Sequence, residues 1–182
     1  MRYPDGHKEA VREKIVRVAS EALRRHGLEA VSIPALMKQA GLTHGGFYAH
    51  FKNRDELVAE AVRAAADETG GGALAPELSL AESLRRYLSM GHLEHREEGC
   101  VLAALGTDGA RQRAPVRRAF AEVARGFLAR IDAKLRPGRA EGARPSDAAL
   151  VQASTMVGAV VLARLVDDPA LAERILAAAR AA

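Results

Sequence analysis

Residues 92 to 100 hold the side chains whose types could do covalent chemistry or bind a metal. His92, His95 and Arg96 precede Cys100, which is the only cysteine in the 182 residues. Nearby positive charge favours the thiolate form of a cysteine, and a thiolate reacts with electrophiles and oxidants. Three glutamates in the same segment oppose that effect. Two interpretations of Cys100 therefore stand side by side, a sensor of electrophiles or oxidants and a small buried hydrophobic residue.

The same segment does not make a convincing metal site. His92, His95 and Cys100 lack a fourth ligand at suitable spacing. A helical enzyme would need convergent catalytic groups, such as paired Glu-x-x-His motifs facing a bundle core, and no such pair occurs. We therefore expect no catalytic residue, no metal and no cofactor, and a helical enzyme is only a remote alternative.

A second group of side chains, in residues 30 to 54, is suited to binding a polyanion. No acidic residue lies between Glu29 and Asp55. A surface free of carboxylates can approach phosphates without repulsion, and each lysine or arginine that meets a phosphate releases counterions. A small buried hairpin with a solvated basic rim is the alternative. The basic residues of this window are Lys38, His44, His50, Lys52 and Arg54.

The spacing within this window predicts two short helices joined by a tight turn. Leu36 and Ala40 recur at helical spacing, and Gly41 then interrupts the pattern. Glycine takes a left-handed backbone conformation at no steric cost, which suits such a turn. Ser32 and Thr43 are N-cap residues by type, so each is expected to begin a helix.

The second of these helices is expected to present an outer face. Phe47 and Phe51 can pack back on Leu36, which leaves the opposite side of the helix free. A face of this size fits a DNA major groove. It carries Thr43, His44, Gly45, Tyr48 and Ala49.

Residues 11 to 62 resemble the N-terminal DNA-binding domain of the tetracycline-repressor (TetR) family of bacterial transcription regulators. They read VREKIVRVASEALRRHGLEAVSIPALMKQAGLTHGGFYAHFKNRDELVAEAV. The features that carry the resemblance are Gly27 after the first helix, the turn AGLT at 40 to 43, the recognition helix FYAHF at 47 to 51, and KNRD at 52 to 55. The rest of the chain resembles the family only in its general helical character.

The resemblance implies which residues meet DNA. Tyr48, His50 and Lys52 are expected to bind phosphates and fix the register, while Thr43 and His44 are expected at base edges. Packing inside the domain is the alternative role of Tyr48, and capping of a helix end is the alternative for His50. The full set of expected DNA-binding residues is Ser32, Thr43, His44, Gly45, Gly46, Tyr48, His50 and Lys52.

Gly45 and Gly46 depart in part from the family pattern, in which the second of these positions more often carries Thr or Ala. Each glycine inside a helix costs up to about 1 kcal/mol relative to alanine. The expected return is a closer approach of the backbone to DNA, with one side chain fewer for reading bases.

Composition indicates an all-α protein in a reducing compartment. Hydrophobic residues make up 48% of the chain, aromatic residues only 4%, and tryptophan is absent. The formal net charge of +4 permits a polyanionic partner. A single cysteine cannot form an intramolecular disulfide, and no apolar run approaches the roughly 18 residues of a membrane span. We therefore expect a cytoplasmic protein without a membrane partner.

Breaker residues at 69 to 78, including Gly70, Gly71, Gly72 and Pro76, predict a division into two domains. Residues 1–68 are expected to form a three-helix helix-turn-helix domain with its connecting helix, and residues 69–182 a helical bundle for ligand binding and dimerisation. Expected elements are a loose arm at 1–7, helices at 8–26, 54–68, 80–90, 114–135, 146–166 and 169–180, an irregular segment at 91–99, and a short apolar turn or helix at 100–105.

The helix predicted at 146–166 is apolar on most faces, so it must be buried on most faces. Ala153, Gly158, Ala159 and Ala163 would permit close helix approach. It is either the central helix of a monomer or, with 169–180, part of a dimer interface. The resemblance favours the dimer, because TetR-like proteins dimerise through their last two long helices.

The resemblance also implies an unknown small-molecule effector that changes the separation of the two DNA-reading heads. The expected function is that of a homodimeric repressor, which binds a palindromic operator and is released by the effector. Ordinary core packing is the alternative role of each expected pocket residue. These residues are Leu84, Tyr87, Leu88, Met90, Phe120, Phe127 and Met156.

Overall fold

The computed structural model describes residues 6–138, 140 and 142–182, and these residues form helices and loops without a β-strand. The all-α fold expected from composition is therefore confirmed. The arm expected at residues 1–7 falls mostly on residues 1–5, which lie outside the described part of the chain.

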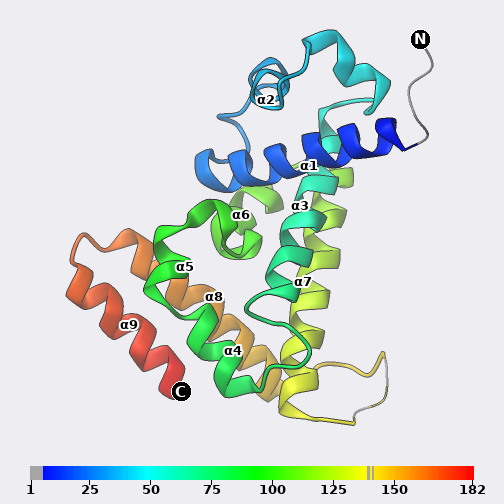
Figure 1. The fold of residues 1–182 in the computed structure, drawn as a ribbon. Helices are drawn as coiled ribbons and strands as arrows, with labels where there is room; N and C mark the ends of the chain where they lie inside the picture. The colour runs from blue at the N-terminus through cyan, green and yellow to red at the C-terminus, as the bar shows by residue number, and fades with distance from the viewer. Residues whose placement is uncertain (1–5, 139, 141) are drawn as a thin grey trace.

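The N-terminal helices form one end of the molecule, where α2 and η1 lie beyond α1 (Figure 1). The chain turns sharply between α1 and α2 and between α2 and η1, and the long α3 then runs away from this end beside α7. Their bounds are α1 His7–His26, α2 Ile33–Gln39, the 3-10 helix η1 His44–Ala49, and α3 Arg54–Gly71.

Helices α4, α6 and α8 pack against α7, and α9 lies beside α8 near the other end (Figure 1). The segment expected to be irregular at 91–99 contains a short helix and a 3-10 turn, and the expected turn at 100–105 is a longer helix. The bounds are α4 Leu80–Tyr87, α5 Met90–Glu94, η2 Arg96–Glu98, α6 Val101–Ala110, α7 Ala114–Leu135, α8 Asp147–Leu165 and α9 Pro169–Ala181.

Side-chain caps begin most of the helices that the sequence predicted. Ser32, Asn53, Ser79 and Ser146 each accept a hydrogen bond from a backbone N–H in the first turn that follows. The cap expected at Thr43 is wrong, because its side chain accepts no such bond. A 3-10 helix starts there instead of an α-helix, so the two-helix motif keeps its turn but not its second α-helix.

Among the described residues, the buried apolar side chains form two clusters. The first joins α1, α2, η1 and α3 and also includes Val101, Leu105 and Phe120 from α6 and α7. The second lies among α4, α7, α8 and α9, around Tyr87 and Met156. Because the first cluster crosses from the N-terminal helices into α6 and α7, the cores do not separate at residue 68, and the domain boundary stays a prediction.

Helix α8 corrects the expectation that no segment approaches a membrane span. By length and composition, Asp147–Leu165 could cross a membrane, with a mean hydropathy of 1.6 and 33% of the window buried inside the protein. Its small residues Ala153, Ala159 and Ala163 are buried against the rest of the chain, whereas Leu162 and Leu165 are exposed. The small residues therefore serve close packing within the protomer.

Candidate nucleic-acid interface

The segment between α2 and α3 is held in place by two buried phenylalanines. Phe47 and Phe51 are almost fully buried and their rings stack with centroids 5.5 Å apart. On the other side, the guanidinium of Arg12 in α1 lies 4.5 Å from the centre of the Phe51 ring. Aromatic packing of this kind fixes the direction in which η1 presents its outer side.

The outer side of η1 is open to solvent. Tyr48 is 62% exposed, and its ring meets that of His44 edge to face with centroids 6.0 Å apart. Thr43, His44 and Gly45 are exposed as well. The structure therefore brings these expected DNA-binding residues together on one face, and Tyr48 does not pack inside the domain.

Ser32 and Lys52 lie exposed at the two ends of the same region. The Ser32 hydroxyl accepts from the backbone N–H of Ala35 at 3.4 Å and can still donate its own proton to another acceptor. The backbone N–H of Lys52 donates to Glu56 at 2.7 Å, which fixes the chain at the entry to α3. Its ammonium group is left in solvent.

Three glycines shape this interface differently. Gly41 has a φ of 70°, in the left-handed region that the predicted turn requires. A Cβ added at Gly45 would meet nothing within 4 Å, and at Gly46 it would meet only ordinary contacts, the nearest at 3.6 Å. The fold therefore does not require glycine at either of these positions. Their low helix propensity gives a physical reason why η1 is a short 3-10 helix.

His50 ends η1 and lies half-buried beside α1. Burial lowers its pKa, and the nearby positive groups Lys8, Arg12 and His7 lower it further. Its Nδ1 atom is buried without a hydrogen-bond partner in the described structure. The sequence reasoning missed Lys8 as a neighbour of this surface, because nothing in a linear pattern shows that the start of α1 lies beside η1.

A hollow of about 240 Å³ lies between α3, α6 and α7. Its apolar floor is formed by Leu74, Val101, Leu102, Val123 and Phe127. Charged side chains stand around it, and two of them, Arg63 and Glu122, pair with each other at 2.8 Å. Their side chains are 45% and 47% exposed, so the pair lies on the solvent side of the hollow.

Of the seven expected pocket residues, Phe127 lines this hollow. Tyr87 borders a second one, of about 230 Å³, near α5, and Met90 borders a third, of about 300 Å³, between α5, α8 and α9. The other four residues are in the buried cores. They are Leu84, Leu88, Phe120 and Met156.

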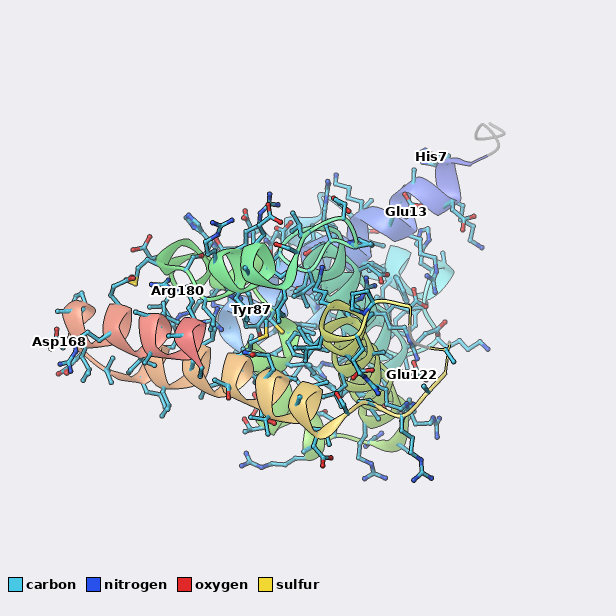
Figure 2. All side chains as sticks on the ribbon, turned by 90° about the horizontal axis from the view of Figure 1, so that it is seen from below. His7, Glu13, Tyr87, Glu122, Asp168 and Arg180 are labelled. Carbon is cyan, nitrogen blue, oxygen red and sulfur yellow. The ribbon has the colours of Figure 1, made fainter. Side chains whose placement is uncertain are left out.

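Cys100 is buried where α6 begins and borders both of the first two hollows. Its backbone N–H donates to Nε2 of His92 at 2.9 Å, so that nitrogen is an acceptor and the Nδ1–H of His92 points to the carbonyl of Tyr87. Burial lowers the pKa of His92 and raises that of Tyr87 well above its usual value. Tyr87 lies within the bundle (Figure 2), and its hydroxyl has no hydrogen-bond partner in the described structure.

Arg24 joins α1 to the chain just before Cys100. The residue is only 3% exposed. Its guanidinium donates to the carbonyl of Gly99 at 2.9 Å and pairs with Glu68 at the end of α3. Its Nε also donates to the carbonyl of Ser20, one turn earlier in α1. A single buried side chain thus connects three segments, and this connection was also missed from the sequence.

Within the described part of the chain, no group of three or more His, Cys, Asp or Glu side chains is arranged to hold a metal ion. The described side chains are suited to contact with a polyanion on the outer side of η1 and to apolar burial in the hollow between α3, α6 and α7.

Comparison with solved structures identifies similar folds over nearly the whole chain. A TetR-family regulator from Agrobacterium tumefaciens has a TM-score of 0.76 at 20% identity, covering 96% of this chain and 98% of that one. The reduced form of E. coli NemR gives 0.74 at 19% identity, with 94% of each chain covered. AibR in complex with isovaleryl coenzyme A and operator DNA gives 0.66 at 16% identity, covering 93% and 96%.

Comparison with family models is the more specific result. No curated protein sequence matches the chain. The model of bacterial regulatory proteins of the tetR family matches residues 15–61, and the model of the tetracyclin repressor-like C-terminal domain matches residues 78–179. Together with the exposed face of η1, these matches show that the chain belongs to the TetR family of bacterial transcriptional regulators, which are DNA-binding proteins and not enzymes.

Proposed function

We propose that this protein is a homodimeric repressor that binds a palindromic operator and is released by a small-molecule effector. The observation that carries the proposal is the open, acid-free face of η1, on which Tyr48 stands 62% exposed above buried phenylalanines. Exposed aromatic and basic side chains that are held in place by buried packing are suited to binding in a DNA groove.

The contacts proposed for this face follow from exposure and chemistry. Thr43 and His44 are assigned to base edges, because they are the exposed side chains with donors and acceptors at the start of η1. Tyr48 and Lys52 are assigned to phosphates, as are His50 and the hydroxyl of Ser32. Gly45 and Gly46 let the backbone approach the DNA, since the fold itself leaves room for side chains there.

The homodimer is proposed to form through α8 and α9. Large apolar side chains on α8 are exposed, with Leu165 at 76% and Val151 at 67%. A monomer in water would gain by covering this face, and a second copy supplies a matching one. A membrane is the weaker alternative, because a lipid-facing helix needs no small-residue face packed on α7 and α9.

The effector is proposed to bind in the hollow between α3, α6 and α7. An effector bound there would contact α6 and α7. The start of α6 is in turn connected to α1, because Arg24 donates a hydrogen bond to the carbonyl of Gly99. The AibR structure contains both isovaleryl coenzyme A and operator DNA, so a protein of this fold is known with both kinds of partner. Movement of α1 would then change the spacing of the two recognition faces.

Operator selection from a random DNA library tests this function directly. The expected site has two-fold symmetry, with half-sites about one helical turn apart. Its affinity should fall steeply as salt rises, because phosphate contacts release counterions. Enrichment of no sequence, or of a site without symmetry, would sink the proposal.

A second candidate function is sensing of electrophiles or oxidants by Cys100. The observation in its favour is that Cys100 borders two hollows and has the unpaired hydroxyl of Tyr87 nearby. Its burial opposes the idea, because a reagent must enter the protein to reach the sulfur. Alkylation with N-ethylmaleimide should lower operator affinity in the wild type and not in Cys100→Ser; unchanged affinity after complete alkylation would exclude the sensor.

We also propose that residues 1–68 and 69–182 are the two domains and that the protein works in the cytoplasm. Support for the first comes from the two family models, which match on either side of this boundary. Support for the second is that a regulator must reach its DNA.

A further inference from the structure

We propose that the ligand of the hollow between α3, α6 and α7 is a small amphipathic carboxylate, whose apolar body lies on the floor and whose carboxylate pairs with Arg130. This inference rests on the proposed effector function and goes one step further, to the chemical class of the effector.

The size and floor of the hollow set the body of the ligand. Its volume is about 240 Å³, and the floor carries Leu74, Val123 and Phe127. An apolar protein cavity of roughly 150 Å³ takes benzene. One ring with a short chain therefore fits, whereas a fused polycyclic compound or a coenzyme does not.

The charges around the hollow set the head of the ligand. Arg63 and Glu122 pair at 2.8 Å and neutralise each other. Asp67 borders both this hollow and the outer groove between α1 and α3, so it is a carboxylate that the head of the ligand must avoid. Arg130 remains, and among the described residues it takes part in no hydrogen bond or ion pair found in the structure. An incoming anion would thus meet a cation that has no competing partner.

Gly70 gives Arg130 its position. A Cβ at Gly70 would lie 2.7 Å from Cζ of Arg130 and less than 3 Å from both terminal nitrogens. The guanidinium therefore occupies the space of the missing side chain, against the last turn of α3. There it faces the hollow and also meets the partial negative charge of the helix end. The planar fork of an arginine held in this way matches a carboxylate through two parallel hydrogen bonds.

Three probes of equal shape test the inference on the full chain by calorimetry: 3-phenylpropanoate, 3-phenylpropanol and 3-phenylpropylamine. The carboxylate should bind about tenfold tighter than the alcohol. The alcohol cannot form the charge-assisted pair with Arg130, which lies at a partly exposed site. The amine should bind weakest. Operator release is measured on the same samples, so that loss of DNA binding is seen separately.

Variants locate the charge. Arg130→Gln should weaken binding of the carboxylate about tenfold and leave the alcohol unchanged. Gly70→Ala should act in the same direction, since its Cβ displaces the guanidinium without removing the charge. Arg125→Gln is the matched control, an exposed arginine on α7 that does not line this hollow.

Four results would overturn the carboxylate assignment: equal affinity for alcohol and carboxylate, tightest binding of the amine, equal effects of the Arg130 and Arg125 variants, or no binding of any probe. If the alcohol binds as tightly as the carboxylate and releases the operator, the effector hollow stands and only the ligand class fails. If the protein without ligand binds no selected operator, the proposed function itself fails.

Discussion

Replacing Arg24 by methionine tests whether one buried side chain holds α1 to the chain just before α6. Methionine keeps most of the apolar stem of arginine, ends short of the guanidinium and removes its donors. The change leaves the carbonyl of Gly99 without its side-chain donor and removes the charge that pairs with Glu68. Glu68 has 42% of its side chain exposed, so water can replace its partner.

The expected loss of stability is therefore dominated by Gly99. A buried acceptor left unsatisfied costs roughly 1 to 3 kcal/mol. Removing a buried guanidinium returns part of that, because a charged group no longer has to be kept out of water. We expect a net loss of about 2 kcal/mol in the free energy of unfolding, or a fall in Tm of about 4 to 8 °C for a chain of this size.

Urea unfolding followed by circular dichroism measures this difference. The control is the adjacent Arg25→Met, whose arginine is 55% exposed and pairs with Glu97 at 2.6 Å. That surface pair should contribute little to stability, because solvent screens it. Equal stability of the Arg24 and Arg25 variants would refute the reasoning. In operator release assays, Arg24→Met should also need more effector than Arg25→Met, because its α1 is no longer joined to Gly99.

Three further predictions concern different parts of the molecule. Gly46→Thr should change operator preference while shifting Tm little, since the added Cβ meets only ordinary contacts; the same selected sites at the same affinity would contradict this. Burial lowers the pKa of His92 in the folded state, so stability should be full above the unfolded value of 6.5 and fall as pH drops below it, with a shallower pH dependence in His92→Gln. Leu162→Asp combined with Leu165→Asp should give folded monomers by light scattering. A double variant that forms dimers over the same concentration range as the wild type would exclude α8 as the interface.

Local chemistry explains why so much of the fold was predictable. Helix starts are indicated by short polar side chains, because these accept hydrogen bonds from backbone N–H groups that the helix leaves free. The residues that do so are Ser32, Asn53, Ser79 and Ser146. Gly41 indicates the turn, because glycine adopts the left-handed φ of this position at no steric cost. These signals act within a few residues, so a single sequence contains them.

Apart from Thr43, the failures have the opposite character, because each depends on contacts between distant segments. Thr43 has the right type for a cap, yet the glycines that follow it accompany a 3-10 helix that makes no use of the hydroxyl. Most of the expected pocket residues were chosen as large apolar side chains, and packing put them in the cores. The positions of Arg24 and Arg130 depend on Gly99 and Gly70, which lie far away along the chain.

The composition of α8 indicates how much apolar surface must be buried, but not which partner covers each face. Its sequence requires burial on most faces, but only one face is buried within the chain. There Ala153, Ala159 and Ala163 lie together with Met156 and Val160. The large residues Leu162 and Leu165 are left outside. Full burial of such side chains stabilises by roughly 1.5 to 3 kcal/mol each, so covering even a few of them on each of two copies offsets much of the entropy lost on association. A helix that leaves large apolar side chains outside after packing one face on its own chain is therefore better suited to a protein partner than to the centre of a monomer.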